Sequence, residues 1–143
     1  MNATMKKFGY PETCVKELQQ WVVLLRPQQV TLGSLVLICR EKATAFSQIS
    51  MDAFEELPRI IREIETSISR AFAYSKINYL MLMMVDPEVH FHVIPRYDAP
   101  RSFNQVQFHD HGWPGPPDLK NPNSITQETN QNILKHLQEI WLA

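Results

Sequence analysis

Glu-Val-His-Phe-His-Val-Ile-Pro-Arg, residues 88–96, is the stretch of sequence that decides most of the interpretation. Ionisable and apolar residues alternate along its first six positions, which is the period of a β-strand. Residues two apart in a strand point to the same side, so Glu88, His90 and His92 are predicted to share one face. Three ionisable side chains in a row are costly to bury without partners, and we therefore expect this face to line a cleft.

The residue types on that face indicate chemistry. Imidazole can act as a nucleophile or carry a proton near neutral pH, and a neighbour that fixes its tautomer sharpens either role. A second His-x-His pair, His109 and His111, occurs further along the chain. The two pairs together with Glu88 would suit a zinc or iron site if they met in space. The simpler reading of His109 and His111 is an exposed polar loop or strand end.

Working outward, the segments before this stretch predict strands and one long helix. Apolar runs at 18–25 and 35–39 predict an antiparallel pair joined by a loop. Apolar residues then recur at threes and fours up to Phe72, which predicts a helix that begins at Ser50. Pro58 inside it predicts either a kink or a later start. A further strand is predicted over 77–84, before the one at 88–94.

The segment after Arg96 predicts a loop-rich tail and a final helix. Trp113 opens a Pro- and Gly-rich loop, and Ser124 with Gln127 offers a capping box for the helix. The apolar face of that helix is predicted to be Ile133, Leu134, Leu137 and Trp141. The order of elements indicates an α+β domain with an antiparallel sheet.

Composition limits the classes of function. The chain has 143 residues, 44% of them apolar, with 14 basic and 15 acidic residues. Duplex nucleic acid binding needs clustered positive charge, which this balance does not indicate. No apolar run approaches the ~20 residues of a membrane span, and the first residues lack a secretory core. With Cys14 and Cys39 as the only cysteines, we expect a reduced cytoplasmic protein with no membrane partner.

Residues 89–96 resemble the signature of the histidine triad (HIT) family. That signature has histidines alternating with apolar residues, followed by two apolar residues and often Pro-Arg. Residues 21–36 also resemble the family's first hairpin, and the helix from 50 to 72 resembles its long helix. The resemblance implies one HIT-like α+β domain over 1–143, with a core at 15–97 and a tail at 98–143. It further implies an antiparallel sheet of about five strands, one long helix, a C-terminal helix and a homodimer.

The resemblance also implies a reaction. The family's nucleophilic middle histidine falls on His90, and its third histidine, which contacts the phosphoryl group, falls on His92. His90 is therefore expected to attack the α-phosphorus of a nucleotide derivative, and water would then release the mononucleotide. The implied substrates are dinucleoside polyphosphates or nucleoside phosphoramidates, with no metal and no cofactor needed.

The sequence departs from the family at its first histidine, which is Glu88 here. A carboxylate at this place would repel a phosphate unless it is paired or turned away. This departure motivates an alternative hypothesis, a nucleotide-binding protein without turnover. The remaining candidates for substrate contact are Asn78, Arg96 and Trp113. Arg96 is also expected to end its strand with its charge in solvent, and Trp113 to serve in packing.

Overall fold

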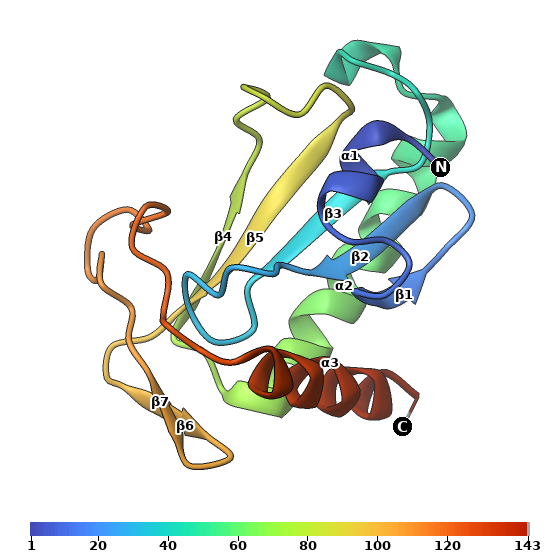
Figure 1. Cartoon of the computed structure of the whole chain (residues 1–143). Helices are drawn as coiled ribbons and strands as arrows, with labels where there is room; N and C mark the ends of the chain where they lie inside the picture. Colours follow the sequence, from blue (N-terminus) through green and yellow to red (C-terminus); the bar gives the residue numbers. More distant parts are fainter. Residues whose placement is uncertain (143) are drawn as a thin grey trace.

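The computed structural model describes residues 1–142, so Ala143, the last residue of the predicted domain, lies outside the described part. Its elements are shown in Figure 1. In chain order they are α1 (Ala3–Lys7), β1 (Cys14–Glu17), β2 (Trp21–Leu25), β3 (Leu35–Cys39), the 3-10 turn η1 (Phe46–Gln48), α2 (Met51–Phe72), β4 (Lys76–Leu80), β5 (His90–Arg96), β6 (Arg101–Phe103), β7 (Val106–Phe108) and α3 (Gln127–Leu142).

Five of these strands form one antiparallel sheet in the order β1-β2-β3-β5-β4. The predicted α+β fold with a five-stranded antiparallel sheet is therefore confirmed. The histidine-bearing strand β5 lies between β3 and β4, one position inside the sheet edge. Side chains of successive residues leave opposite faces of a strand, so β5 contributes to both layers of the molecule.

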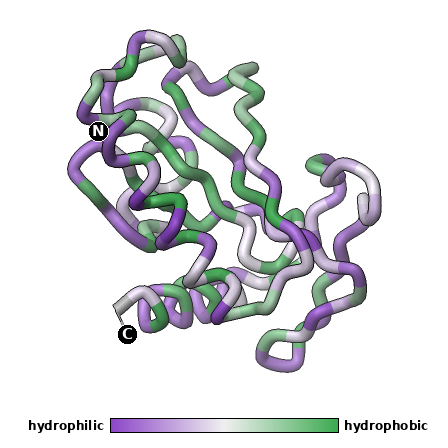
Figure 2. The backbone as a smooth tube through the Cα atoms, turned by 180° about the vertical axis from the view of Figure 1, so that it is seen from behind, coloured by the Kyte–Doolittle hydropathy of each residue, from purple (hydrophilic) through white to green (hydrophobic). Residues whose placement is uncertain are grey.

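One face of the sheet carries the main core beneath the two long helices. In α2, the residues Ile60, Ile64 and Ile68 recur every four positions and are fully buried. Trp21 of β2 is also fully buried, and its indole N–H donates to the carbonyl of Ala53 at 2.8 Å. Figure 2 shows hydrophobic residues concentrated in the central strands, whereas α3 alternates between hydrophobic and hydrophilic. Packing of these helix faces against one side of the sheet holds β5 in position.

The opposite face of the sheet is covered in part by α1, which the sequence did not predict. Met5 and Phe8 pack there on the outward side chains of β2 and β3. The side chain of Asn2 caps α1 by accepting from the Met5 N–H at 2.9 Å, and it donates to the Cys39 carbonyl at 2.8 Å. A helix of five residues has too few turns for a periodic apolar pattern, and tertiary contacts supply its stability.

Several predicted boundaries differ from the structure. The run at 18–25 was wrong as one strand, because the chain turns after Leu18 and pairs a separate strand, β1, with β2. The strand predicted at 77–84 ends at Leu80, and the one predicted at 88–94 begins at His90. Pairing with β3 and β4, not apolar character, sets these limits.

The helix starts show which capping signals hold. Helix α2 begins after Ser50 as predicted, and the Ser50 hydroxyl accepts from the Ala53 N–H at 3.1 Å. The alternative start at Pro58 was wrong, since this exposed proline lies inside the continuous 22-residue helix. For α3 the Ser124 capping box was wrong: Thr126 accepts from the Thr129 N–H at 3.1 Å, and the helix begins at Gln127.

The tail wraps back onto the sheet. A small hairpin of β6 and β7 follows β5, and residues 109–123 then form the loop seen beside β4 and β5 in Figure 1. Asn123 ties this loop to the rest of the chain, because its backbone N–H donates to the Gln29 carbonyl at 2.9 Å. None of the described helices combines the length and the apolar character needed to cross a bilayer.

Candidate functional site

Strand β5 places two histidines side by side on the α1 face of the sheet. His90 lies opposite Ile38 and His92 opposite Val36 in the antiparallel register. Paired residues of an antiparallel ladder point to the same side, so both imidazoles share the face on which Phe8 packs. The His90 and His92 rings meet edge to face with centroids 5.1 Å apart. Only 1% of His90 and 8% of His92 is exposed, so a ligand reaches either ring only through a local cleft.

The orientation of His90 is fixed by its own chain. Its Nδ1 lies 2.7 Å from the backbone carbonyl oxygen of Glu88, two residues earlier. A carbonyl oxygen can only accept, so this contact requires the proton on Nδ1 in the neutral ring. The lone pair is then on Nε2. This is the arrangement that a nucleophilic imidazole needs, with one nitrogen held and the other available.

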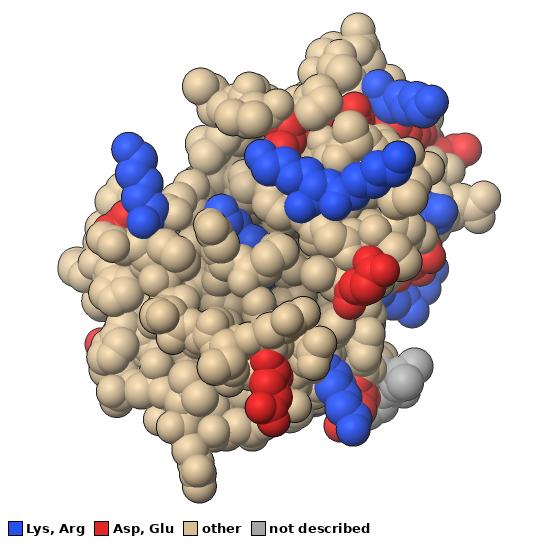
Figure 3. All heavy atoms as spheres, in the orientation of Figure 1, with Lys and Arg blue, Asp and Glu red and all other residues tan. Residues whose placement is uncertain are grey.

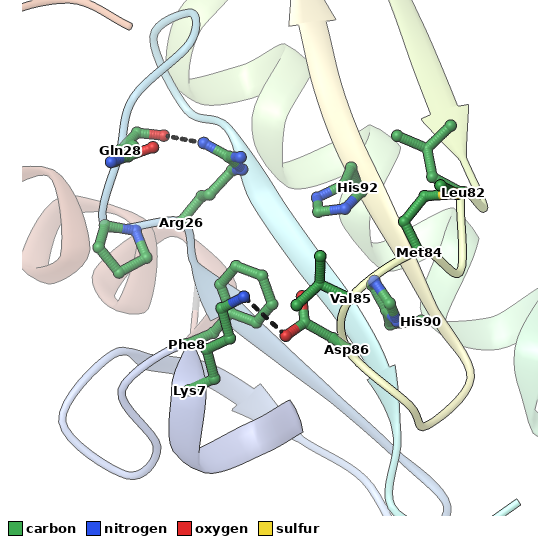
Figure 4. A pocket seen from close by; sticks show the side chains of 11 residues that line it. Lys7, Phe8, Arg26, Gln28, Leu82, Met84, Val85, Asp86, His90 and His92 are labelled. Carbon is green, nitrogen blue, oxygen red and sulfur yellow. Dashed lines mark hydrogen bonds and ion pairs between the residues drawn. The ribbon is translucent and has the colours of Figure 1, made fainter. Parts of the chain in front are cut away.

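Both histidines line a cleft of about 470 Å³, within the usual size range for small-molecule sites. Figure 4 shows its walls coming from four separate parts of the chain. Lys7 and Phe8 come from the end of α1, and Arg26 follows β2. The segment between β4 and β5 supplies the remaining wall, which is formed by Leu82, Met84, Val85 and Asp86.

Some polar atoms of the cleft make no hydrogen bond within the described part of the chain. Burial lowers the pKa of His92 to about 4, with the positive charge of Arg26 and then His90 adding to the effect. His92 is therefore neutral at pH 7. Its Nδ1 and the Nε of Arg26 are both buried and make no hydrogen bond to any described residue. Burial also lowers the pKa of Arg26, although a guanidinium stays protonated at neutral pH.

Glu88 does not face the cleft, which corrects the expectation that it shares a face with the two histidines. It precedes β5, and its buried carboxylate turns toward the start of α1. There Oε1 accepts from the Thr4 backbone N–H at 2.9 Å and from the Thr4 hydroxyl at 2.8 Å. The Glu88 N–H donates to the same hydroxyl at 3.2 Å. The carboxylate is thus paired with a helix N-terminus, where negative charge is favourable.

Asn78, Arg96 and Trp113 lie together, but none of them lines the cleft. The buried guanidinium of Arg96 donates to both carboxylate oxygens of Asp110, at 2.7 and 3.0 Å. It also donates to the Asn78 side-chain oxygen at 2.8 Å, and it lies 5.9 Å from the centre of the Trp113 ring. The expectation of a solvent-exposed Arg96 was wrong. Its donors hold the tail against β4 and β5, because a buried charge must be paired.

The second His-x-His pair is exposed and lies apart from the first. His109 and His111 stack with centroids 5.9 Å apart, and the Nδ1 of His111 lies 2.9 Å from the Asn121 carbonyl oxygen. Within residues 1–142, no group of three or more His, Cys, Asp or Glu side chains is placed to hold a metal ion. The structure therefore does not assemble the proposed zinc or iron site, and the loop reading of this pair is the one observed.

Sequence reasoning missed five polar or aromatic residues of the cleft, namely Lys7, Phe8, Arg26, Gln28 and Asp86. Lys7 and Phe8 were missed because α1 carries too few residues for a periodic signal. Arg26 was treated only as the end of a strand, and Asp86 only as part of a chain break before Pro87. For Arg26, a charge directly after a strand is a usable signal, since the loops that follow rigid strands often carry binding residues.

The comparisons with known proteins agree on the fold. The structure matches a histidine triad protein from Bradyrhizobium japonicum with a TM-score of 0.73 at 18% identity, covering 97% of this chain and 95% of that one. A histidine triad protein from Sinorhizobium meliloti gives 0.74 at 17% identity, with 97% and 94% covered. A hypothetical histidine triad nucleotide-binding protein from Sulfolobus tokodaii gives 0.68 at 17% identity, with 91% and 83% covered.

Neither a protein-family model nor a curated protein sequence matches the chain. At such low identities the likeness to solved structures establishes the fold. The protein therefore has the histidine triad fold, with two histidines facing a cleft from β5, the fourth strand in the order of the sheet. The resemblance noted in the sequence is confirmed at this level.

Proposed function

We propose that the protein hydrolyses or transfers nucleotides through a covalent nucleotidyl-histidine formed on His90. The observation that carries this proposal is the 2.7 Å contact between His90 Nδ1 and the Glu88 carbonyl oxygen. It holds the ring in one orientation and leaves the Nε2 lone pair for attack inside the cleft. No other imidazole that lines this cleft has a ring nitrogen held in this way.

The proposed reaction has two displacements at one phosphorus atom. In the first, His90 Nε2 donates its electron pair to the α-phosphorus, and the bond from phosphorus to the leaving group breaks. The leaving group departs with that electron pair and takes up a proton from solvent water. The Glu88 carbonyl accepts a hydrogen bond from Nδ1–H as positive charge develops on the ring. In the second step, water attacks phosphorus and releases a proton to solvent. The P–N bond breaks with its electron pair returning to Nε2, and the nucleoside monophosphate leaves with His90 restored.

The cleft has groups suited to an anionic ligand. Among the residues that the structure describes, three buried side-chain atoms have no hydrogen-bond partner, and two of them, Arg26 Nε and His92 Nδ1, belong to residues that line the cleft. Unpartnered buried polar atoms are uncommon, and a bound ligand or water is a usual explanation. Lys7 adds a second full positive charge at the end of α1. A phosphoryl oxygen between these groups would meet the charge that it requires.

Glu88 supports the proposal through its position. Because its carboxylate is paired with Thr4, it does not present free negative charge to a phosphate in the cleft. The sequence departure at this residue is therefore compatible with turnover. The Sulfolobus tokodaii protein of the same fold, a hypothetical nucleotide-binding protein, supports the nucleotide as the ligand class. We also propose a cytoplasmic setting, since Cys14 and Cys39 are both free thiols. The homodimer stays a prediction, which sedimentation would check.

The experiment compares wild type, His90→Ala and the control His109→Ala on adenosine phosphoramidate and diadenosine polyphosphates. His109 is exposed and lies outside the cleft, so its variant controls for loss of a histidine. We expect mononucleotide from wild type and His109→Ala, and at least a hundredfold less from folded His90→Ala. Intact mass after a rapid quench in base should show one nucleotidyl group on wild type. Equal turnover by His90→Ala would refute the proposal.

The alternative, binding without turnover, is separated by the same samples. Calorimetric binding of a mononucleotide by wild type, with no product from any substrate in the panel, would establish it. In that case the His90 orientation would serve ligand binding alone.

A further inference from the structure

Asp86 occupies an unexpected place for an acidic residue. It lies in the segment between β4 and β5, and it lines the cleft together with Lys7, Arg26 and both histidines. Its side chain is only 11% exposed. It is the one acidic residue among those that line this cleft. An anion beside a phosphate site weakens phosphate binding, so its presence calls for a reason.

The carboxylate of Asp86 interacts with each cationic part of the cleft. Its Oδ1 lies 2.8 Å from the Lys7 ammonium nitrogen, an ion pair that joins α1 to the β4–β5 segment and is drawn in Figure 4. Its charge also raises the pKa of both Arg26 and His92, against the larger opposite effect of burial. The field of Asp86 therefore reaches the groups that would meet a ligand.

The result is a cleft with little net charge. Lys7 and Arg26 are its two full cations, Asp86 is its one anion, and His92 is neutral at pH 7. When His90 is neutral, as attack requires, the balance is one positive charge. Both basic and acidic side chains are present on the face shown in Figure 3. The charge that a ligand meets is thus set mainly by these three residues.

We propose that Asp86 determines substrate specificity, making the cleft select a reacting phosphoryl group with one negative charge over a polyphosphate chain. This inference rests on the proposed function and narrows its substrate class. The favoured substrates are nucleoside phosphoramidates or phosphodiesters whose leaving group is uncharged or cationic. A longer phosphate chain brings further negative charges into a cleft with only one uncompensated cation, and charges that lie near Asp86 are repelled by it.

Nucleotide binding provides a test that does not depend on turnover. Dissociation constants of AMP, ADP and ATP are measured by calorimetry without divalent cations, at low salt, for wild type and Asp86→Asn. We expect Asp86→Asn to improve ATP binding relative to AMP by roughly tenfold, as loss of one close charge allows. The gain should shrink as salt is raised.

Two controls isolate the position and the charge. Asp98→Asn makes the same change in net charge at an exposed residue outside the cleft, and Asp86→Glu keeps the charge in place. Both should keep the wild-type ratio of ATP to AMP binding. Should Asp86→Asn fail to fold, Lys7→Gln gives the opposite test, because loss of this cation should weaken ATP binding more than AMP binding.

The outcomes distinguish the two proposals. An unchanged ratio in folded Asp86→Asn, with nucleotides still bound, overturns the role of Asp86 and leaves the proposed function standing. Binding of no nucleotide by wild type removes the proposed function and this inference with it. The expected shift in the ratio, absent from both controls, supports the inference.

Discussion

Replacement of Glu88 by alanine should destabilise the protein strongly, although Glu88 lies outside the cleft. Its carboxylate accepts two hydrogen bonds from Thr4, and both residues are buried. A hydrogen bond to a charged group contributes about 1.5–3 kcal/mol, and a buried donor left without a partner carries a further penalty. We therefore expect Glu88→Ala to lower the free energy of unfolding by about 3–5 kcal/mol.

The glutamine variant should separate geometry from charge. Glu88→Gln keeps an acceptor oxygen in place, so we expect a loss of only about 1 kcal/mol. Thr4→Val removes the hydroxyl but keeps the backbone N–H. Its loss of unfolding free energy should lie between the losses in Glu88→Ala and Glu88→Gln. Because Glu88 and Thr4 contact each other, the double variant should cost less than the two single changes added together.

Urea unfolding followed by tryptophan fluorescence measures these differences, since Trp21 is fully buried in the core. A loss of about 4 kcal/mol corresponds to a melting temperature lower by roughly 8–16 °C for a domain of this size. Hydrogen exchange of the α1 amides gives a local readout, because Glu88 holds the start of that helix. Wild-type stability in both Glu88→Ala and Glu88→Gln, or additive effects in the double variant, would refute the reasoning.

Three further predictions concern other contacts. As pH falls from about 6.5 to about 4, His92 is protonated in the unfolded chain before it is protonated in the folded one, so the free energy of unfolding should fall by up to about 3 kcal/mol from this group. Urea unfolding at a series of pH values should show a smaller fall in His92→Gln, and an identical pH dependence would contradict the prediction. Arg96→Ala should cost about 3–5 kcal/mol by leaving Asp110 buried and unpaired, whereas wild-type thermal stability would show that water replaces the pair. Gly33→Ala should lower the free energy of unfolding by about 1–3 kcal/mol, measured by the same urea series, because φ is +85° there and a Cβ would lie 2.9 Å from the Phe72 ring. Unchanged stability would contradict this expectation.

Much of the fold could be predicted because its signals are local. The period of two in 88–96 and the period of threes and fours up to Phe72 each describe one face of one element. The Ser50 cap is equally local, since one hydroxyl binds an amide three residues later. Elements with weak local signals were missed. Strand β1 is short and partly polar, α1 has five residues, and the β6–β7 hairpin has three residues in each strand.

The candidate site was predictable only in part, for the same reason. His90 and His92 could be placed on one face because strand geometry relates residues two apart. Their partners could not, because Lys7 and Arg26 approach from segments far away in the sequence. Glu88 shows the limit most clearly. Strand β5 begins two residues later than the alternating pattern suggests. The Glu88 side chain therefore points toward α1 and not into the cleft.

The sequence by itself determined the class of fold, the strand that carries the chemistry and the residue proposed to act as nucleophile. The fold class and the strand follow from backbone periodicity and the order of elements, which are properties of neighbours along the chain. The role of His90 is what the resemblance of residues 89–96 to the histidine triad family implies. Tertiary structure alone decided which charges surround His90, whether Glu88 is paired, and that Arg96 holds the tail and does not line the cleft. Charge and burial depend on which side chains meet in space, and that depends on the packing of every element at once.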